Sequence, residues 1–596
     1  MNPISQTLSI KMPEEKHKDS TPNSSDIEAL ANKTAKVTSI ENKSELSGWP
    51  KFKDSFKRAH VEDYGLDPNM PEDEKIAILT AHSSLHRKLK NRHLQMIAIG
   101  GAIGTGLFVG SGSGLATGGP AGLIIGYILV GSMIYCSVQS LGELAVTFPV
   151  QGAFVTYNSR FIDPSWGFAM AWNYAIMWLI VLPLELVAAS LTIKYWDPNT
   201  NSAAYVTAFY FFIIAINFFG VRGYGEAEFV FSIVKVVAIL GFIILGIVLI
   251  TGGGPQGGYL GGYYWHIEGA PFPNGFKGVV TVFVGAAFAF AGTELCGLAA
   301  AESDNPRKAL PKACKQVFWR ITLFYVVSLT LIGLLVAHDN ERLLGASSVD
   351  ATASPFVIAI QNGGIKGLPS VMNVVIMISV LSVGNSSLFG ATRALCALAA
   401  AKQAPSILAY IDKKGRPLVA ILVQLSVGCL CYLAATPKQG EVFAWMMALT
   451  GLATLINWGS INTCFIRFRY ALKAKGRDTS ELTFASQPGL FGAYWGLCLV
   501  IIIVCLQVWL AIFPLKQKPN AEVFFQTLLS IPIILCFYIG HKIYTRNWKF
   551  YIKAEDIDID TGRKETDLEL LKQEIAEEKI YLRSLPFYMR VYNFWC

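Results

Sequence analysis

Long apolar segments separated by short polar ones fill the middle of this 596-residue chain. Residues 1–96 and 542–596 are polar and rich in charge, whereas the sequence between them consists mainly of continuous apolar runs. Each run is close to the roughly 20 residues that a helix needs to cross a bilayer. We count twelve runs, at residues 97–116, 121–142, 166–193, 203–220, 229–251, 279–301, 319–337, 368–392, 418–435, 442–466, 493–514 and 521–541.

This pattern predicts an all-α integral membrane protein with twelve transmembrane helices. One apolar run alone could be a buried helix of a soluble protein, but twelve in series cannot share one soluble core. The hydrophobicity is continuous and does not alternate, which favours helices over a β-barrel. We expect a largely disordered cytoplasmic N-terminal tail (1–96), a twelve-helix domain (97–541) and a cytoplasmic C-terminal tail (542–596).

The distribution of charge predicts the orientation of the chain. The net charge is +8, and orientation follows the Lys and Arg residues of short loops. With both termini in the cytosol, the loops on the cytoplasmic side carry most of these residues. The excess of positive charge is therefore explained by the membrane topology, and we expect no nucleic-acid partner. The basic run 87–92 could contact anionic membrane lipids, or it could be an ordinary basic flank of the first span.

Two of the predicted spans are unusual. The first contains the glycine-rich sequence GGAIGTGLFVGSGSG at 100–114, and the sixth contains FAFAGTE at 288–294. Because each glycine costs about 1 kcal/mol in a helix, a continuous helix over the first sequence would be weak. Spans one and six correspond if the core consists of two five-helix repeats, and paired interrupted helices point to an inverted-repeat transporter.

An interrupted helix in mid-membrane offers free backbone N–H and C=O groups. The N–H end attracts a carboxylate and the C=O end suits an ammonium group, so such a site fits the backbone of an α-amino acid. Gly104 and Gly106 would let a substrate approach the main chain closely. The alternative is helix packing, because Gly106, Gly110 and Gly114 are spaced by four. These residues alone do not decide between the two.

Ionisable residues inside spans are costly, and each is a candidate functional group. We rank Glu294 and Lys235 first and Glu185 next. Lys235 could be a fixed cation or a proton-sensitive group that bridges helices, or it could extend its amine to the inner surface. Glu294 could face a substrate ammonium or carry a proton. The chain shows no Walker A motif, metal-ligand cluster or nucleophile elbow, so we expect no enzyme activity, no cofactor and no metal.

Several sequence motifs resemble those of the fungal amino acid permease family, within the amino acid–polyamine–organocation superfamily. The resemblance covers residues from about 49 to the C-terminus and is greatest to the general amino acid permease branch. The motifs are HLQMIAIGGAIGTG at 93–106, GELA at 142–145, GYGEAEF at 223–229, FWRI at 318–321, ASSVD at 346–350, DIDTGR at 558–563 and NFWC at 593–596.

The resemblance implies a LeuT-like core, a 5+5 inverted repeat followed by two further helices, with helices one and six broken. It also implies proton-coupled uptake of L-amino acids at the plasma membrane. Protons would be coupled through Lys235, Glu294 and Glu185. By the same resemblance, the substrate would be bound by Ile103, Gly104, Thr105, Gly106, Phe290, Ala291, Gly292, Thr293 and Glu294.

Members of this family are regulated through their tails. The resemblance therefore implies contacts with ubiquitin-ligase and trafficking machinery, for which Lys11, Lys16 and Lys18 are candidate ubiquitin sites by position. Cys596 ends the chain beside aromatic residues and is a candidate for palmitoylation, although an unmodified terminus is the alternative.

Three functions stay open at this point. The first is a proton-coupled permease of broad amino acid range. The second is a permease of narrow range, for histidine or basic amino acids, because selectivity depends on the shape of the pocket. The third is an amino acid sensor that binds its ligand and signals without net transport.

Overall fold

The structure is a computed structural model of the full chain. It describes residues 103–149, 154–218, 220–295, 306–344, 354–413, 415–436 and 438–561, with a few short pieces outside these ranges. The chain divides into two compact units, Met1–Ser55 and Phe56–Cys596, and the fold below is that of the second unit. Lys11, Lys16, Lys18 and Cys596 lie outside the described residues.

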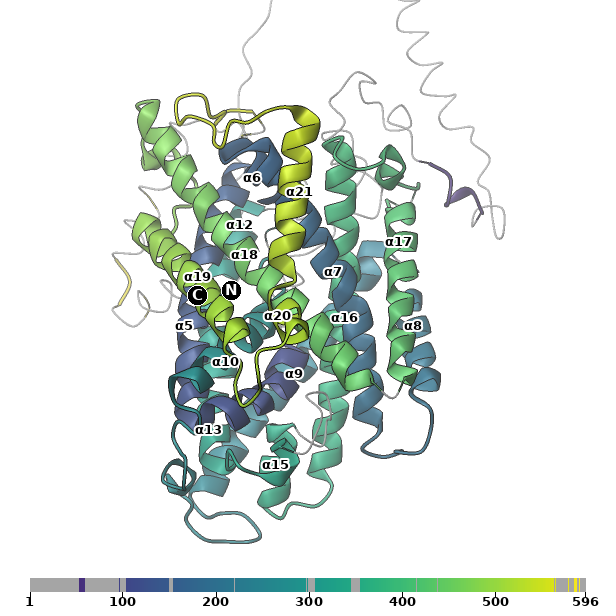
Figure 1. The fold of residues 1–596 in the computed structure, drawn as a ribbon, viewed down its shortest axis with the longest axis vertical. Helices are drawn as coiled ribbons and strands as arrows, with labels where there is room; N and C mark the ends of the chain where they lie inside the picture. The colour runs from purple at the N-terminus through teal and green to yellow at the C-terminus, as the bar shows by residue number, and fades with distance from the viewer. Residues whose placement is uncertain are drawn as a thin grey trace, which may run out of the picture. The chain divides into compact units, whose positions relative to one another are not determined.

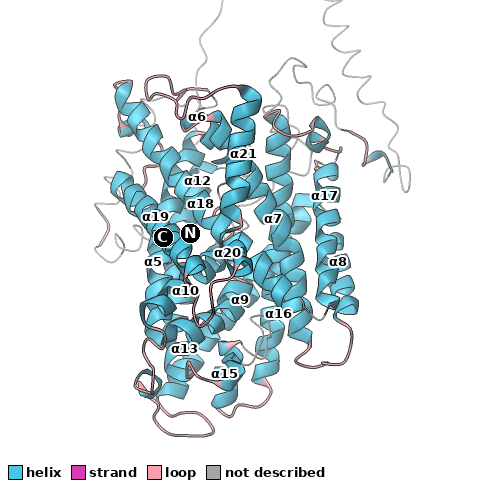
Figure 2. Cartoon of the chain, in the orientation of Figure 1, coloured by secondary structure: helices cyan, strands magenta, loops and turns pink. Residues whose placement is uncertain are grey.

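The described part of the second unit is built from helices (Figure 2), and its β-structure consists of an isolated bridge between Arg58 and Asp412. Two π-helices, η2 (Gly106–Gly110) and η5 (Arg320–Val327), continue into α5 and α13. The α-helices are α5 (Ser111–Thr147), α6 (Phe154–Phe161), α7 (Pro164–Ile193), α8 (Ser202–Phe218), α9 (Gly220–Ile250), α10 (Gly275–Phe290), α12 (Pro306–Trp319), α13 (Ser328–Leu335), α14 (Glu341–Leu344), α15 (Pro355–Asn362), α16 (Leu368–Ala400), α17 (Leu418–Gly428), α18 (Gln439–Ala474), α19 (Gly489–Ile512), α20 (Ala521–Leu528) and α21 (Ser530–Thr545). Short 3-10 helices complete the set at η3 (Tyr263–Trp265), η7 (Ser406–Ala409), η8 (Cys429–Ala435) and η9 (Thr479–Glu481).

The number of helices that could each cross a membrane differs from the predicted twelve. Within the described residues, eight helices are long and apolar enough, or nine if α20 and α21, bent by 64°, form one span. The first two predicted spans lie in one helical stretch, Gly106–Thr147, interrupted at Gly119 (φ +73°) and Pro120. Helices α8 and α10 have 17 and 16 residues, fewer than the roughly 20 residues that typically span a bilayer.

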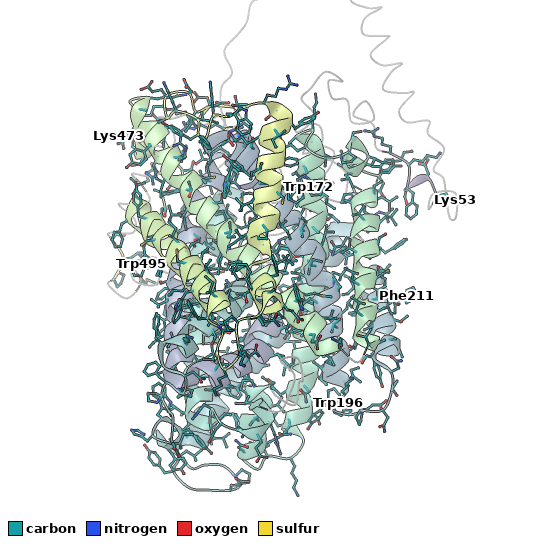
Figure 3. The ribbon with its side chains drawn as sticks, in the orientation of Figure 1. Lys53, Trp172, Trp196, Phe211, Lys473 and Trp495 are labelled. Atoms are coloured by element: carbon teal, nitrogen blue, oxygen red, sulfur yellow. The ribbon has the colours of Figure 1, made fainter. Side chains whose placement is uncertain are left out.

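Apolar side chains cover the outer surface of several helices, which marks a multi-pass membrane protein. Phe211 on α8, Ile244 on α9 and Phe491 on α19 are each exposed over more than half of their surface, at 64%, 66% and 79%. In water such a surface would cause aggregation, whereas lipid chains cover it without cost. Figure 3 shows Phe211 and Trp495 on opposite flanks of the bundle, with Lys473 and Trp196 towards its two ends.

The centre of the bundle is formed by α7 with α16 and by α5 with α10, the two helix pairs that pack most extensively. Figure 1 shows these helices running along the length of the bundle, with α6 near one end and α13 and α15 near the other. Helix α7 begins with a well-formed cap, because Asp163 accepts hydrogen bonds from the amides of Ser165 and Trp166 and Pro164 occupies the first helical position. Most of α7 is buried.

Residues 552–563, here called the C-terminal strap, fasten the end of the bundle that contains α6. The Ile552 amide donates to the Ile162 carbonyl over 3.0 Å, and the Arg160 guanidinium donates to the Thr561 carbonyl over 2.7 Å. Arg477 pairs with Asp560 at 2.5 Å, and Ile559 is fully buried. The strap therefore joins the loop after α6 to the loop after α18.

Candidate functional site

The beginning of the first span is irregular and fully buried. Ile103 and Gly104 precede the π-helix at Gly106–Gly110, and the Gly104 carbonyl accepts from the amides of both Leu107 and Phe108 at 3.2 Å. Thr105 is 1% exposed. These residues therefore lie inside the bundle and not at its surface.

Gly104 and Gly106 allow neighbouring helices to approach closely. A Cβ atom on Gly106 would lie 2.3 Å from the Ala289 Cα of α10, and one on Gly104 would lie 2.4 Å from Cγ2 of Val383 on α16. At Gly110 the nearest atom would be 3.9 Å away. Gly106 is thus required by helix packing, as the alternative interpretation of the sequence held, while Gly110 is not.

The sixth predicted span stops being helical where its carboxylate lies. Helix α10 ends at Phe290, residues 291–294 form a turn, and Gly292 adopts a φ of +92°, which favours glycine. Oε2 of Glu294 accepts from the Gly292 amide at 3.2 Å and from the Trp458 indole at 3.4 Å. Among the described residues, Oε1 of Glu294 has no hydrogen-bond partner, and the side chain is buried.

Arg320 is a buried cation beside this turn that sequence reasoning missed. The charge pattern alone places it in a cytoplasmic loop, but the structure leaves it 1% exposed at the start of η5, where its guanidinium donates to the Thr293 hydroxyl. The hydroxyl in turn donates to the Phe290 carbonyl at 2.6 Å. The available signal was a single arginine flanked by Phe318, Trp319 and Ile321.

A second buried polar cluster joins the first span to α7. The Thr105 hydroxyl donates to Oε2 of Glu185 at a short distance of 2.5 Å, and Glu185 is 1% exposed. The positive charge of Lys235 acts on this carboxylate from α9. Two of the ranked ionisable residues are therefore brought together, whereas Glu294 belongs to the contacts around Gly292 and Trp458.

Lys235 is paired inside the bundle. It is fully buried, so the expectation that it might extend to the inner surface is wrong. Its Nζ lies 3.8 Å from Oε1 of Glu228 and donates to the Ser382 hydroxyl of α16 at 2.7 Å. That hydroxyl donates to Oε1 of Glu228 at 2.6 Å. Sequence reasoning missed Glu228, although a spacing of seven residues puts it on the same face of α9 as Lys235.

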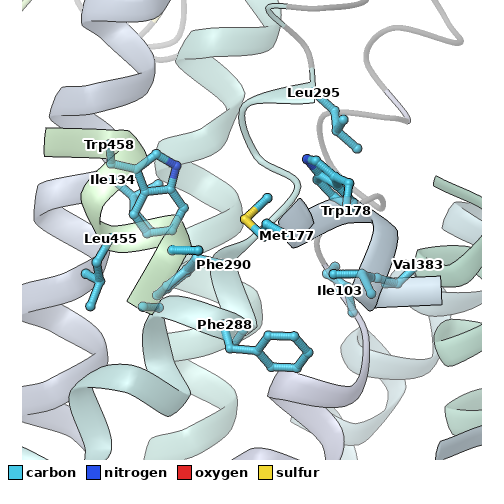
Figure 4. Close-up of a cluster of buried hydrophobic side chains, with 14 of the residues drawn as sticks. Ile103, Ile134, Met177, Trp178, Phe288, Phe290, Leu295, Val383, Leu455 and Trp458 are labelled. Atoms are coloured by element: carbon cyan, nitrogen blue, oxygen red, sulfur yellow. The ribbon is translucent and has the colours of Figure 1, made fainter. Parts of the chain in front are cut away.

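Aromatic and sulfur-containing side chains form a buried hydrophobic cluster that includes Ile103 of the first span and Phe290 of α10 (Figure 4). Figure 4 shows Phe290, Met177 and Trp178 directed towards a common centre, with Trp458 on one side and Ile103 beside Val383 on the other. Phe290 also packs against Tyr325, with ring centroids 4.2 Å apart. The Thr454 hydroxyl contacts the Met177 sulfur at 3.0 Å.

A cavity of about 480 Å³ opens beside the first span. Among its lining residues are Gly110 and Thr117 of α5 and its π-helix, Thr281 of α10, Met447 of α18 and Gln526 of α20. The described residues that line it include no Asp, Glu, Lys, Arg or His. The cavity offers neutral hydrogen-bonding groups and apolar surface, and Tyr127, whose hydroxyl donates to the Gly106 carbonyl at 3.2 Å, lies between it and the first span.

Residues 93–553 match the family described as "Amino acid permease". The chain belongs to this family. It is 71% identical to General amino-acid permease GAP2 of Candida albicans over 93% of this chain and 95% of that protein. It is 58% identical to General amino-acid permease GAP1 of Saccharomyces cerevisiae over 94% of each chain. The resemblance predicted from the sequence motifs is confirmed.

A solved structure of Mhp1, described as a nucleobase-cation-symport-1 family transporter in a closed conformation with bromovinylhydantoin bound, aligns with a TM-score of 0.42 and 14% identity. The alignment covers 77% of this chain and 99% of that chain, and a likeness at this score says nothing further about this chain. The relatives of this permease-family chain are permeases and not enzymes. The roles that the resemblance implied for individual site residues stay predictions.

Proposed function

We propose that this protein carries L-amino acids across the plasma membrane into the cell, driven by protons, through alternating access. The observation that carries the proposal is the pairing of two irregular segments inside the bundle. Ile103 and Gly104, which precede the π-helix of the first span, are non-helical, α10 ends at Phe290, and the two segments touch where Gly106 meets Ala289. Such paired interruptions bring opposite helix termini to one place.

The two segments offer complementary groups for an amino acid. The amides around Ile103, Gly104, Thr105 and Gly106 would receive the substrate carboxylate. The turn formed by Ala291, Gly292, Thr293 and Glu294 would receive the ammonium group, and Oε1 of Glu294, which has no hydrogen-bond partner in the described part of the chain, supports this assignment. Phe290, Met177 and Trp178 would enclose the side chain.

Proton coupling would run through Glu185 and Lys235. Thr105 supports this link, because it belongs to the substrate-binding segment and its hydroxyl is bonded to Glu185. A movement of the first span on substrate binding would therefore shift Glu185, and the electrostatic interaction between Glu185 and Lys235 would change with it. Glu294 would be the third proton-coupling residue, as the carboxylate that contacts the substrate ammonium group.

The proposed membrane arrangement has twelve spans, a LeuT-like 5+5 inverted repeat and two further helices, with both tails in the cytosol. The interruption at Gly119–Pro120 supports separating the first two spans. The tails would act in regulation, through ubiquitin on Lys11, Lys16 or Lys18, lipid attachment at Cys596, and contact with membrane lipids and trafficking proteins.

Broad substrate range is supported by the cavity of about 480 Å³ beside the first span. Because its lining has no charged side chain, it would not reject acidic, basic or neutral amino acids by electrostatic repulsion. The names of the relatives GAP1 and GAP2 point the same way. No observation favours the narrow-range permease or the sensor.

The test is uptake by purified protein in liposomes with an imposed inward proton gradient. One neutral, one acidic and one basic labelled amino acid are compared, with a protonophore as control. We expect all three to accumulate and the accumulation to collapse with the protonophore. Accumulation of one class alone would replace the broad range by a narrow one, and binding without accumulation would favour the sensor.

A further inference from the structure

The ion pair of Glu228 and Lys235 has the form of a proton relay. Lys235 Nζ donates to the Ser382 hydroxyl at 2.7 Å, and the same hydroxyl donates to Oε1 of Glu228 at 2.6 Å. The three groups come from two helices, α9 and α16, and all are fully buried. A buried ion pair rarely stabilises a fold better than apolar side chains would, so a structural purpose alone explains this arrangement poorly.

The arrangement has a direction along α9. Glu228 precedes Lys235 by seven residues, about 10 Å of helix rise, so its Cα lies nearer the end where α9 begins, which the proposed topology places in the cytosol. The Lys235 side chain points back towards that end, as helical side chains do. Glu185, the other acid that acts on Lys235, lies on the side of the first span and the substrate-binding segment.

Polar groups continue from Glu228 towards the cytoplasmic mouth. Ser386 and Asn385 lie beside its carboxylate. Ser386 is 3.2 Å from the Tyr224 hydroxyl, and the Asn217 amide donates to Asn385 at 2.7 Å. Tyr224 and Asn217 both line a small cavity of about 20 Å³ with Arg393 and Arg416. Polar groups therefore extend from the ion pair towards the inner end of α16, and Oε2 of Glu228 itself has no hydrogen-bond partner among the described residues.

We propose that Glu228 is the acceptor that receives the coupled proton from Lys235 and releases it to the cytosol. This inference rests on the proposed proton coupling. In the transfer, Lys235 gives a proton to Ser382 Oγ while Ser382 gives its own proton to Oε1 of Glu228. One N–H bond and one O–H bond break and two O–H bonds form, which leaves a neutral amine, an intact hydroxyl and a carboxylic acid. Glu228 then loses its proton to inner water, and Lys235 takes up another from the outer side.

The charged groups around Glu228 fit this role. Lys235 of its own helix lies opposite, Glu185 of α7 acts on that lysine, and α16 contributes the neutral Ser382, Ser386 and Asn385. The carboxylate can therefore be charged while Lys235 is charged and neutral once Lys235 is neutral, so the pair carries no net charge in either state.

The decisive variant is Glu228→Gln in liposomes, with Glu226→Gln as the matched control. Glu226 lies two residues away in the same motif and is partly exposed. We expect proton-driven accumulation by Glu228→Gln to be at least tenfold lower than in the wild-type protein. Gradient-free exchange of labelled for unlabelled amino acid should stay within about twofold of the wild-type rate. A role in folding alone would reduce both readouts together. Full gradient-driven accumulation in Glu228→Gln would overturn the inference.

Two further measurements keep the test decisive. If Glu228→Gln does not fold, Ser382→Ala and Ser382→Thr take its place, because the relay needs a hydroxyl at that position. Loss of driven accumulation in Ser382→Ala and its recovery in Ser382→Thr, with exchange preserved in both, would support the relay, and equal accumulation in both would refute it. The wild-type protein tests the proposed proton coupling separately. Exchange by the wild-type protein without any proton-driven accumulation would reject that coupling.

Discussion

At the scale of single residues, the site contains buried polar side chains with one atom that has no hydrogen-bond partner among the described residues. Glu294 illustrates this, because Oε2 is bonded to the Gly292 amide and the Trp458 indole while Oε1 is free among the described residues. The sequence singled out Glu294, Lys235 and Glu185 as candidates, since a charge inside an apolar run is visible without a structure, and all three are buried. It could not predict their partners, because Ser382 and Trp458 are far away along the chain.

We predict that Glu294→Gln weakens substrate recognition more than folding. Glutamine can still accept from the Gly292 amide, but the attraction to a substrate ammonium is lost. A hydrogen bond to a charged group contributes about 1.5–3 kcal/mol, so the KM for a neutral amino acid should rise roughly ten- to a hundredfold. Glu441→Gln, in an exposed ion pair with Lys438, is the control. An unchanged KM would remove Glu294 from the substrate site.

At the scale of helices, the close contact between the first span and α10 is the feature on which the site depends. Gly106 lies directly against the Ala289 backbone, the Tyr127 hydroxyl donates to the Gly106 carbonyl, and the Tyr325 hydroxyl donates to the Ala289 carbonyl at 2.8 Å. The glycine-rich sequence predicted an irregular first span. The choice between packing and binding needed the neighbouring helix, because glycine spacing is the same for both.

We predict that Gly106→Ala destabilises the bundle and abolishes uptake. The new methyl group would overlap the Ala289 backbone, which cannot rotate away as a side chain can, and such overpacking costs about 1–3 kcal/mol. A lower melting temperature in detergent and at least tenfold lower uptake should follow. Gly241→Ala on α9 is the matched control, because nothing lies within 4 Å of its added Cβ. Equal behaviour of the two variants would contradict the packing argument.

At the scale of the whole molecule, apolar runs predicted the helical membrane class but not the length of each helix. The described part of the run 97–116 from Gly106 and the run 121–142 lie in one helical stretch, and the gap between the two runs falls at its kink, at Gly119 and Pro120. Hydropathy therefore located this boundary but did not show that helix continues on both sides of it. The contacts of the C-terminal strap could not be predicted from the sequence either, since its partners Arg160, Arg477 and Glu481 are distant along the chain.

We predict that Asp558→Ala loosens the C-terminal strap. Partial burial raises the pKa of Asp558, but hydrogen bonds from the Thr561 side chain and amide and from the Asp560 amide outweigh it and hold the pKa at about 2. Losing a side-chain cap of this kind costs about 1 kcal/mol, a factor of about five in the opening equilibrium. Protease cleavage within residues 552–561 at neutral pH should be faster by about that factor. Asp556→Ala, at an exposed position, should leave it unchanged.

The lowered pKa of Asp558 sets how the stability of the C-terminal strap depends on pH. A folded pKa below the unfolded value stabilises the strap at every pH above about 4. That contribution is lost as the pH falls from about 4 towards 2, and wild-type cleavage should then approach that of Asp558→Ala. A difference between the two proteins that persists below pH 2 would show that the Asp558 charge is not what fastens the strap.

The backbone contact between Gly106 and Ala289 also limits how the protein can change shape. Two helices that touch through their main chains cannot slide past each other without breaking this contact. The irregular start of the first span and the end of α10 should therefore travel as one rigid body, and α7 with α16, the other closely packed pair, should form the frame against which it swings. The hinge of the transport cycle would then be the surface between these two bodies, where Thr105 meets Glu185 and Gly104 meets Val383.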